Sequence, residues 1–155
     1  MENKKSRSET AAELFLNGYN CAQSVVGAFA DKTDIDFDTL MRLSSSFGGG
    51  LGRLREVCGA VSGMAMIAGI LYGYEKPDDS AGKIEHYELI QNLVQDFKDK
   101  HETIICRELL AGIKKTEGAV PEARTKEYYK TRPCAMFVET AAEILDKYIE
   151  EHPCK

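Results

Sequence analysis

Four of the five cysteines in this chain lie where a thiol could do chemistry. Cys21 follows an asparagine that can cap a helix, Cys58 follows a glycine-rich stretch, and Cys134 follows a proline typical of a first helical turn. The positive end of the helix dipole favours the thiolate, which is the form that attacks disulfides and binds metals. Cys106 is expected later in its helix, on the apolar side that meets the core.

Three interpretations of these thiols remain open, because no C-x-x-C pair is present to indicate a zinc ribbon or a thioredoxin motif. The first is thiol–disulfide exchange or electron transfer, in which one thiol attacks and another resolves, and we expect Cys58 to attack. The second is a metal site with an iron–sulfur cluster or zinc as its cofactor. The third is a non-catalytic dimeric helical domain whose cysteines only pack. The candidate catalytic thiols and the candidate metal ligands are the same four residues, Cys21, Cys58, Cys106 and Cys134.

A glycine-rich loop at 48–52 precedes Cys58 and leads into two arginines. Glycine backbone can approach an anion closely, and arginine adds forked hydrogen-bond donors. The candidate anion- or cofactor-binding residues are therefore Gly49, Gly50, Gly52, Arg53 and Arg55. Alternatively, the glycines only make a tight turn. The stretch is neither a Walker nor a Rossmann motif, since no strand precedes it and no Lys-Ser/Thr follows.

Helical periodicity predicts the elements that must position these residues. We expect helices at about 8–17, from 21, from 37 to 47, at 53–72, at 81–100, from 106 to 113 and from about 133, the last one capped by Thr131. Residues 114–130 are expected to form a charged surface loop. No alternating run is long enough for a strand. The predicted fold is all-α, a compact bundle of six to seven helices around a central glycine-rich apolar helix at about 53–72, in a single domain over 1–155.

Composition narrows the class of partner. A net charge of −5 argues against nucleic acid and anionic membranes. The most apolar run, at 57–72, is shorter than the roughly 20 residues of a membrane span. We expect a cytoplasmic protein without membrane insertion, where a permanent disulfide framework is disfavoured. The expected partner is a redox protein or a small thiol, with a homodimer as a further hypothesis.

The chain resembles the redox-active protein family named for its cysteine pattern, C_GCAxxG_C_C. The matching stretches are 18–25 (GYNCAQSV), 47–53 (FGGGLGR), 58–63 (CGAVSG) and 106–110 (CRELL), followed by Cys134. The resemblance implies that Cys21, Cys58, Cys106 and Cys134 form the site, with oxidoreductase chemistry on an unspecified substrate. It leaves Cys154 outside the site, in a tail that we expect to be exposed.

Overall fold

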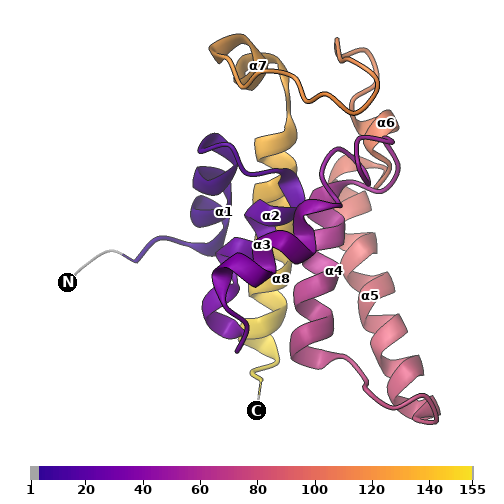
Figure 1. The fold of residues 1–155 in the computed structure, drawn as a ribbon. Helices are drawn as coiled ribbons and strands as arrows, with labels where there is room; N and C mark the ends of the chain where they lie inside the picture. Colours follow the sequence, from indigo (N-terminus) through magenta and orange to yellow (C-terminus); the bar gives the residue numbers. More distant parts are fainter. Residues whose placement is uncertain (1–3, 155) are drawn as a thin grey trace.

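The computed structural model describes residues 4–154, and this part of the chain is mainly helical (Figure 1). Its elements are α1 (Arg7–Leu16), α2 (Cys21–Ala28), the short 3-10 helix η1 (Ala30–Lys32), α3 (Phe37–Ser45), α4 (Gly59–Tyr72), α5 (Ser80–His101), α6 (Cys106–Leu109), α7 (Lys126–Thr131) and α8 (Cys134–Glu151). The all-α fold class is confirmed. Residues 4–154 contain eight α-helices rather than six or seven, because α7 forms inside the segment predicted to be a loop.

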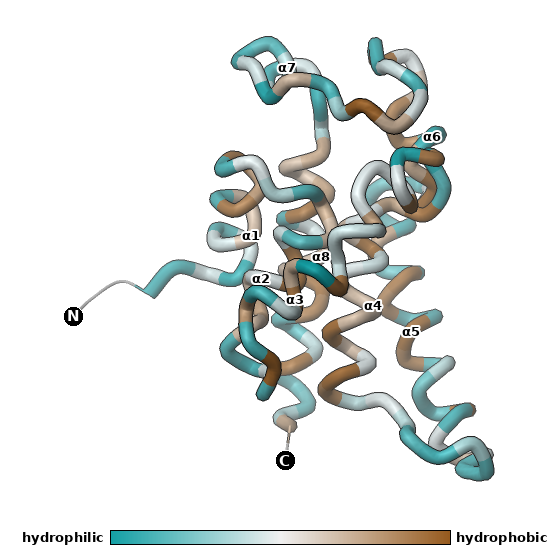
Figure 2. The backbone as a smooth tube through the Cα atoms, viewed as in Figure 1, coloured by the Kyte–Doolittle hydropathy of each residue, from teal (hydrophilic) through white to brown (hydrophobic). Residues whose placement is uncertain are grey.

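Helices α2, α4 and α8 form the centre of the bundle (Figure 1). α8 packs against α1, α2, α4 and α5, and α4 packs against α2, α5 and α8. Figure 2 shows α4 mainly in apolar colours, whereas the turn that follows it is hydrophilic. Fully buried side chains include Phe15, Val25, Met64, Ile67 and Leu145. Burying each such side chain contributes roughly 1.5–3 kcal/mol, so the three central helices share one core.

The central helix begins at Gly59, so the predicted start at about 53 is wrong. Residues 49–53 form a left-handed loop instead, in which Leu51 and Arg53 have φ of 69° and 64°. Arg55, just before the helix, has φ of 63°. Non-glycine residues rarely adopt this conformation, and nothing in the sequence marks it here. The loop also uses its own N–H groups, since those of residues 51–56 donate to carbonyls within 46–51.

A long-range backbone pairing holds the segment before α4 in place. The Cys58 N–H donates to the Ile104 carbonyl at 2.7 Å, and the Cys106 N–H donates to the Glu56 carbonyl at 2.6 Å. Val57 and Ile105 form an antiparallel bridge between these two contacts. Residues 55–58 therefore run beside 104–107, and they cannot be helical at the same time.

α2 and α4 approach closely at two glycines of α4. A Cβ added at Gly59 would lie 2.9 Å from the Phe47 carbonyl oxygen and 3.0 Å from the Ala22 nitrogen. At Gly63 it would lie 2.8 Å from the Ala22 oxygen. Such distances are shorter than van der Waals contact, so the absence of a side chain is what permits this packing. The two glycines thus seat α2 on α4.

Two further boundaries differ from the predicted ones. α6 ends at Leu109, because its C-cap residue and the following left-handed Gly112 turn the chain before Ile113. Thr131 is the last residue of α7 and does not cap α8, whose N-cap is Pro133. Within residues 4–154, none of the helices combines the length and the apolar character that a membrane span requires.

Candidate redox site

Two of the cysteines open helices that pack against each other. Cys21 is the first residue of α2, and Asn20 caps that helix: its side chain accepts from the Gln23 N–H at 2.9 Å, while the Gln23 side chain accepts from the Asn20 N–H at 3.1 Å. Cys134 is the first residue of α8, directly after Pro133. Because α2 and α8 are in contact, their N-termini can bring the two thiols together.

The other two cysteines are held by the backbone pairing that precedes α4. Cys58 is the N-cap residue of α4, and Cys106 is the first residue of α6. Cys58 therefore lies at the helix start rather than one turn inside it. Cys106 lies at the start of its own short helix, not later in it as predicted, because the chain folds back at Ile105 to pair with Val57.

All four cysteines line one small cavity of about 60 Å³, which we call the thiol cavity. Its lining consists of Phe15, Asn20, Cys21, Gly49, Gly50, Arg55, Cys58, Gly59, Cys106, Leu109, Leu110, Arg124, Tyr128, Arg132, Cys134 and Phe137. The volume corresponds to about two water molecules. The four cysteines are free thiols; three are buried and Cys21 is half-buried. Cys154 is exposed, as expected, and does not line the cavity.

Cys21 and Cys134 form a hydrogen-bonded pair of thiols with opposite acidities. Their mutual hydrogen bond lowers the pKa of Cys134 to about 7 and raises that of Cys21 well above its ordinary value, so the Cys21 S–H is the donor. The positive charges of Arg132 and Arg124 favour the Cys134 thiolate further, against the opposing effect of burial. A thiol with a pKa near 7 is about half ionised at neutral pH. Cys134 is therefore the thiolate of the site.

Cys58 and Cys106 remain protonated. Burial raises the pKa of Cys58 to about 12, although the N–H groups of Ala60 and Val61 oppose this shift. Burial also raises the pKa of Cys106, opposed by the guanidinium of Arg55. The expectation that Cys58 attacks is therefore contradicted, because its place at a helix N-terminus does not outweigh the loss of solvent.

A second, larger cavity of about 420 Å³ adjoins the thiol cavity, and we call it the arginine pocket. Its lining consists of Asn20, Ser45, Gly48, Gly49, Gly52, Arg53, Arg55, Ala119, Pro121, Glu122, Arg124, Tyr128 and Arg132. Six of these residues also line the thiol cavity, namely Asn20, Gly49, Arg55, Arg124, Tyr128 and Arg132. Each of the five predicted anion-binding residues lines one cavity or both: Gly49 and Arg55 line both, Gly50 the thiol cavity, and Gly52 and Arg53 the arginine pocket.

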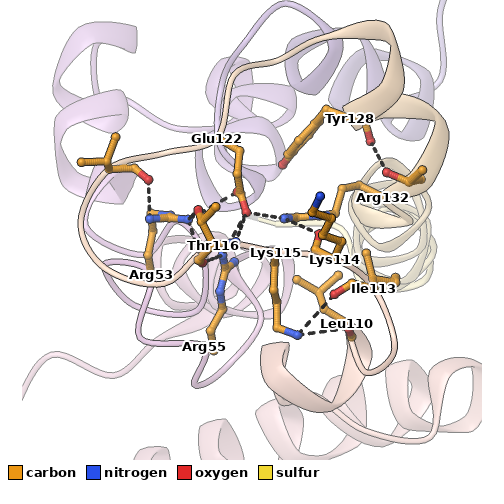
Figure 3. A network of polar contacts seen from close by, with 12 residues as sticks. Arg53, Arg55, Leu110, Ile113, Lys114, Lys115, Thr116, Glu122, Tyr128 and Arg132 are labelled. Carbon is orange, nitrogen blue, oxygen red and sulfur yellow. Dashed lines mark hydrogen bonds and ion pairs between the residues drawn. The ribbon is translucent and has the colours of Figure 1, made fainter.

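Glu122 is the one carboxylate in the lining of the arginine pocket, and three arginines share it (Figure 3). Its oxygens lie 2.6 Å from Arg132, 3.4 Å from Arg53 and 3.8 Å from Arg55. Burial would raise the pKa of Glu122, but the Thr116 N–H and Arg132 outweigh it and lower that pKa to about 2. The carboxylate is therefore ionised at neutral pH and offsets part of the charge of the arginines.

Arginine contacts also fasten the segment between α6 and α7. Arg53 donates to the carbonyls of Thr116, Gly118 and Val120 (Figure 3). Arg124 donates to the Phe15 carbonyl at 3.0 Å, and its guanidinium lies over the Phe15 ring. These bonds hold residues 114–124 over the cysteines as part of the site.

The sequence interpretation missed the contribution of this segment. Glu122, Arg124, Tyr128 and Arg132 lie in or next to a stretch that composition marks as a solvated loop. One signal was available: Arg132 lies two residues before Cys134, where a cation can favour the thiolate. The long-range contacts of Glu122 and Arg124 have no local signature.

The thiols are not arranged as metal ligands. Among residues 4–154, no group of three or more His, Cys, Asp or Glu side chains has the geometry to hold a metal ion. Coordination by all four thiolates would therefore require these side chains to reorient. The protein-side chemistry that the arrangement allows directly is attack by one thiolate with a second thiol beside it.

Comparison with known proteins supports a redox role for these residues. A family model described as "Putative redox-active protein (C_GCAxxG_C_C)" matches residues 19–148, which include all four cysteines of the site and the glycine loop. No match was found among curated proteins or among solved structures. The match covers most of the chain, and we conclude that the chain belongs to this family of redox-active proteins.

Proposed function

We propose that the protein carries out thiol–disulfide exchange, with Cys134 as the attacking thiolate and Cys21 as the resolving thiol. The observation that supports this proposal best is the hydrogen bond between the two thiols, which lowers the pKa of Cys134 to about 7. A thiol whose pKa is close to the ambient pH combines a large thiolate fraction with good nucleophilicity. Neither Cys58 nor Cys106 has this property.

The reaction balances with a disulfide as the oxidant. The Cys134 thiolate attacks one sulfur of the substrate, a new S–S bond forms, and the other half of the substrate leaves as a thiolate. Cys21 then loses its proton to solvent and attacks the Cys134 sulfur, which releases the second half as a thiolate. The two protein thiols lose two electrons and the substrate disulfide gains them. An external dithiol would return the protein to its reduced form.

The test is a rate measurement on reduced protein with the neutral reagent 2-hydroxyethyl disulfide at pH 7. We expect fast loss of two free thiols per chain, restored by dithiothreitol. Cys134→Ser should abolish the fast phase, while Cys21→Ser should stop the reaction at the mixed disulfide on Cys134, detected by mass. Cys154→Ser is the control and should leave the rate unchanged. A fast phase that survives in Cys134→Ser would contradict the proposal.

A second candidate is a cysteine-ligated metal site holding an iron–sulfur cluster or zinc. It is favoured by one observation: four thiols surround the cavity, whereas exchange needs only two. The arginines nearby would offset the negative charge that several thiolates carry. Anaerobic purification followed by iron, sulfide and zinc analysis tests this candidate. Stoichiometric metal that is lost in both Cys58→Ser and Cys106→Ser would support it, and metal-free protein with fast exchange would exclude it.

A further inference from the structure

The arginine pocket has the size of a small-molecule site. Its volume of about 420 Å³ lies within the range of about 300–1,000 Å³ in which proteins commonly bind small ligands. It adjoins the thiol cavity, with which it shares Arg55, Arg124 and Arg132. A ligand with its bulk in the pocket could therefore place a slender end among the thiols.

The charge in this pocket is unbalanced. Four arginines line it, and Glu122 is the one carboxylate in the lining. Two of the guanidiniums are deeply buried, since Arg55 is 3% exposed and Arg132 is 7% exposed. Buried charge is unfavourable unless it is paired. Glu122 and the Cys134 thiolate offset two of the four positive charges, which leaves an excess that favours an anion.

One buried donor in the pocket lacks a partner. Within residues 4–154, Nε of Arg55 forms no hydrogen bond, while Nη2 of the same guanidinium donates to the Thr116 carbonyl at 3.2 Å. Buried donors are normally satisfied, and an unsatisfied one costs about 1–3 kcal/mol. Since Arg55 lines both cavities, an anionic group at their junction would supply the missing acceptor.

We propose that the arginine pocket binds the carboxylate of a low-molecular-weight anionic disulfide, whose sulfur end enters the thiol cavity. This inference rests on the proposed exchange function and adds the class of substrate. The sulfur nearest Cys134 forms the mixed disulfide, and the other half leaves as an anionic thiolate. Cys21 then displaces the first half, so that two anionic thiols are released for each pair of protein thiols oxidised.

The overall charge of the protein makes the test sharp. The chain carries a net charge of −5, so general electrostatics would attract a cationic reagent and repel an anionic one. A preference for an anion must therefore come from local groups. Three simple disulfides of similar size supply the comparison: 3,3′-dithiodipropionate is anionic, 2-hydroxyethyl disulfide is neutral and cystamine is cationic.

The experiment measures the second-order rate constant of the reduced protein with each disulfide at pH 7. Each value is divided by the rate constant of the same disulfide with 2-mercaptoethanol, which removes differences in leaving-group reactivity. We expect the normalised order anionic, then neutral, then cationic. Equal normalised rates, or a faster cationic reagent, would overturn the inference while leaving the exchange function intact. Slow reaction with all three would mean that the exchange function itself fails.

A matched pair of variants locates the effect. Arg53 is absent from the groups that shift the pKa of Cys134, so Arg53→Gln should leave the neutral rate unchanged and lower the anionic rate about tenfold. The neutral reagent thereby reports whether the variant is folded. Arg42→Gln, on the exposed side of α3, should change neither rate. An anionic preference that persists in Arg53→Gln would overturn the assignment to this pocket.

Discussion

The two pairs of cysteines show how the same residue type acquires different chemistry around one cavity. Cys21 and Cys134 begin two packed helices and are hydrogen-bonded to each other, with Arg124 and Arg132 beside Cys134. Cys58 and Cys106 are fixed by backbone pairing and lie deeper in the core. The first pair contains a thiolate at neutral pH, whereas the second is held in the thiol form by burial.

The difference teaches that a helix N-terminus is not sufficient to activate a cysteine. Cys58 caps α4 and faces two backbone N–H groups, yet burial raises its pKa to about 12. Cys134 has the same kind of position and, in addition, an S–H donor and two guanidiniums. Neighbouring donors and full charges therefore decide the outcome when the dipole and desolvation oppose each other.

The largest expected effect separates the two pairs by reactivity. In a Cys154→Ser background at pH 7, Cys134→Ser should slow the fastest alkylation by iodoacetamide about 50-fold or more, because every remaining thiol of the site has a raised pKa. Cys58→Ser should leave it nearly unchanged. Mass spectrometry identifies the alkylated residue. If Cys58 is modified first, the comparison is reversed.

The next effect concerns the place where the two pairs are pressed together. Gly59→Ala would put a Cβ 3.2 Å from Cys21 Cβ and 2.9 Å from a backbone oxygen that cannot move freely. We expect a loss of about 2 kcal/mol of unfolding free energy, measured by urea denaturation. Gly69→Ala on the same helix meets no atom within 4 Å and should stabilise by about 0.5–1 kcal/mol. Equal effects of the two substitutions would show that α2 and α4 are not in tight contact there.

The hydrogen bond within the first pair can be tested by pH dependence. The alkylation rate of Cys134 should rise with pH through a midpoint near 7 and then level off, because only the thiolate reacts. Cys21→Ala removes the S–H donor and should move the midpoint upward by about one pH unit. Cys21→Ser keeps a donor and should move it less. Identical midpoints in both variants would show that the Cys21 donor is not what lowers the pKa.

The smallest effect concerns the acidic partner of the arginines. The folded-state pKa of Glu122, about 2, lies below its ordinary value of 4.5, so the folded protein binds this proton less tightly than the unfolded chain. Its contribution to stability is present above about pH 4.5 and is lost as the pH falls toward 2. Glu122→Gln should lower stability by about 1 kcal/mol at pH 7 and reduce the loss on acidification.

Urea denaturation at pH 7 and pH 3 measures both quantities. Glu117→Gln, at an exposed position of the same segment, is the matched control and should change neither. An acid response of Glu122→Gln that equals that of the unaltered protein would show that the three arginines do not depend on this carboxylate.

Local features of the fold could be predicted because their signals are local. The Asn20 cap and the apolar stripes predicted α2, the central position of α4 and most of α8. The start of α4 could not be predicted, since it depends on left-handed Arg53 and Arg55 and on pairing with residues about 50 positions away. A glycine-rich loop followed by apolar residues looks the same in sequence whether or not the arginines are helical.

The same distinction holds for the site. Membership of the four cysteines followed from their pattern, but their order of acidity did not, because it depends on burial and on which arginines lie near. Arg124 reaches the site through carbonyls of α1 and the loop after it, more than 100 positions away in the chain. Assigning the attacking thiol thus required the tertiary structure.

Disulfide mapping after mild oxidation tests the central claim most directly. Reduced Cys154→Ser protein would be treated with one equivalent of 2-hydroxyethyl disulfide, blocked with iodoacetamide, digested and analysed by mass spectrometry. The account predicts one dominant linkage, between Cys21 and Cys134, with Cys58 and Cys106 recovered as thiols. A dominant Cys58–Cys106 bridge, or a mixture of the possible pairings, would contradict it.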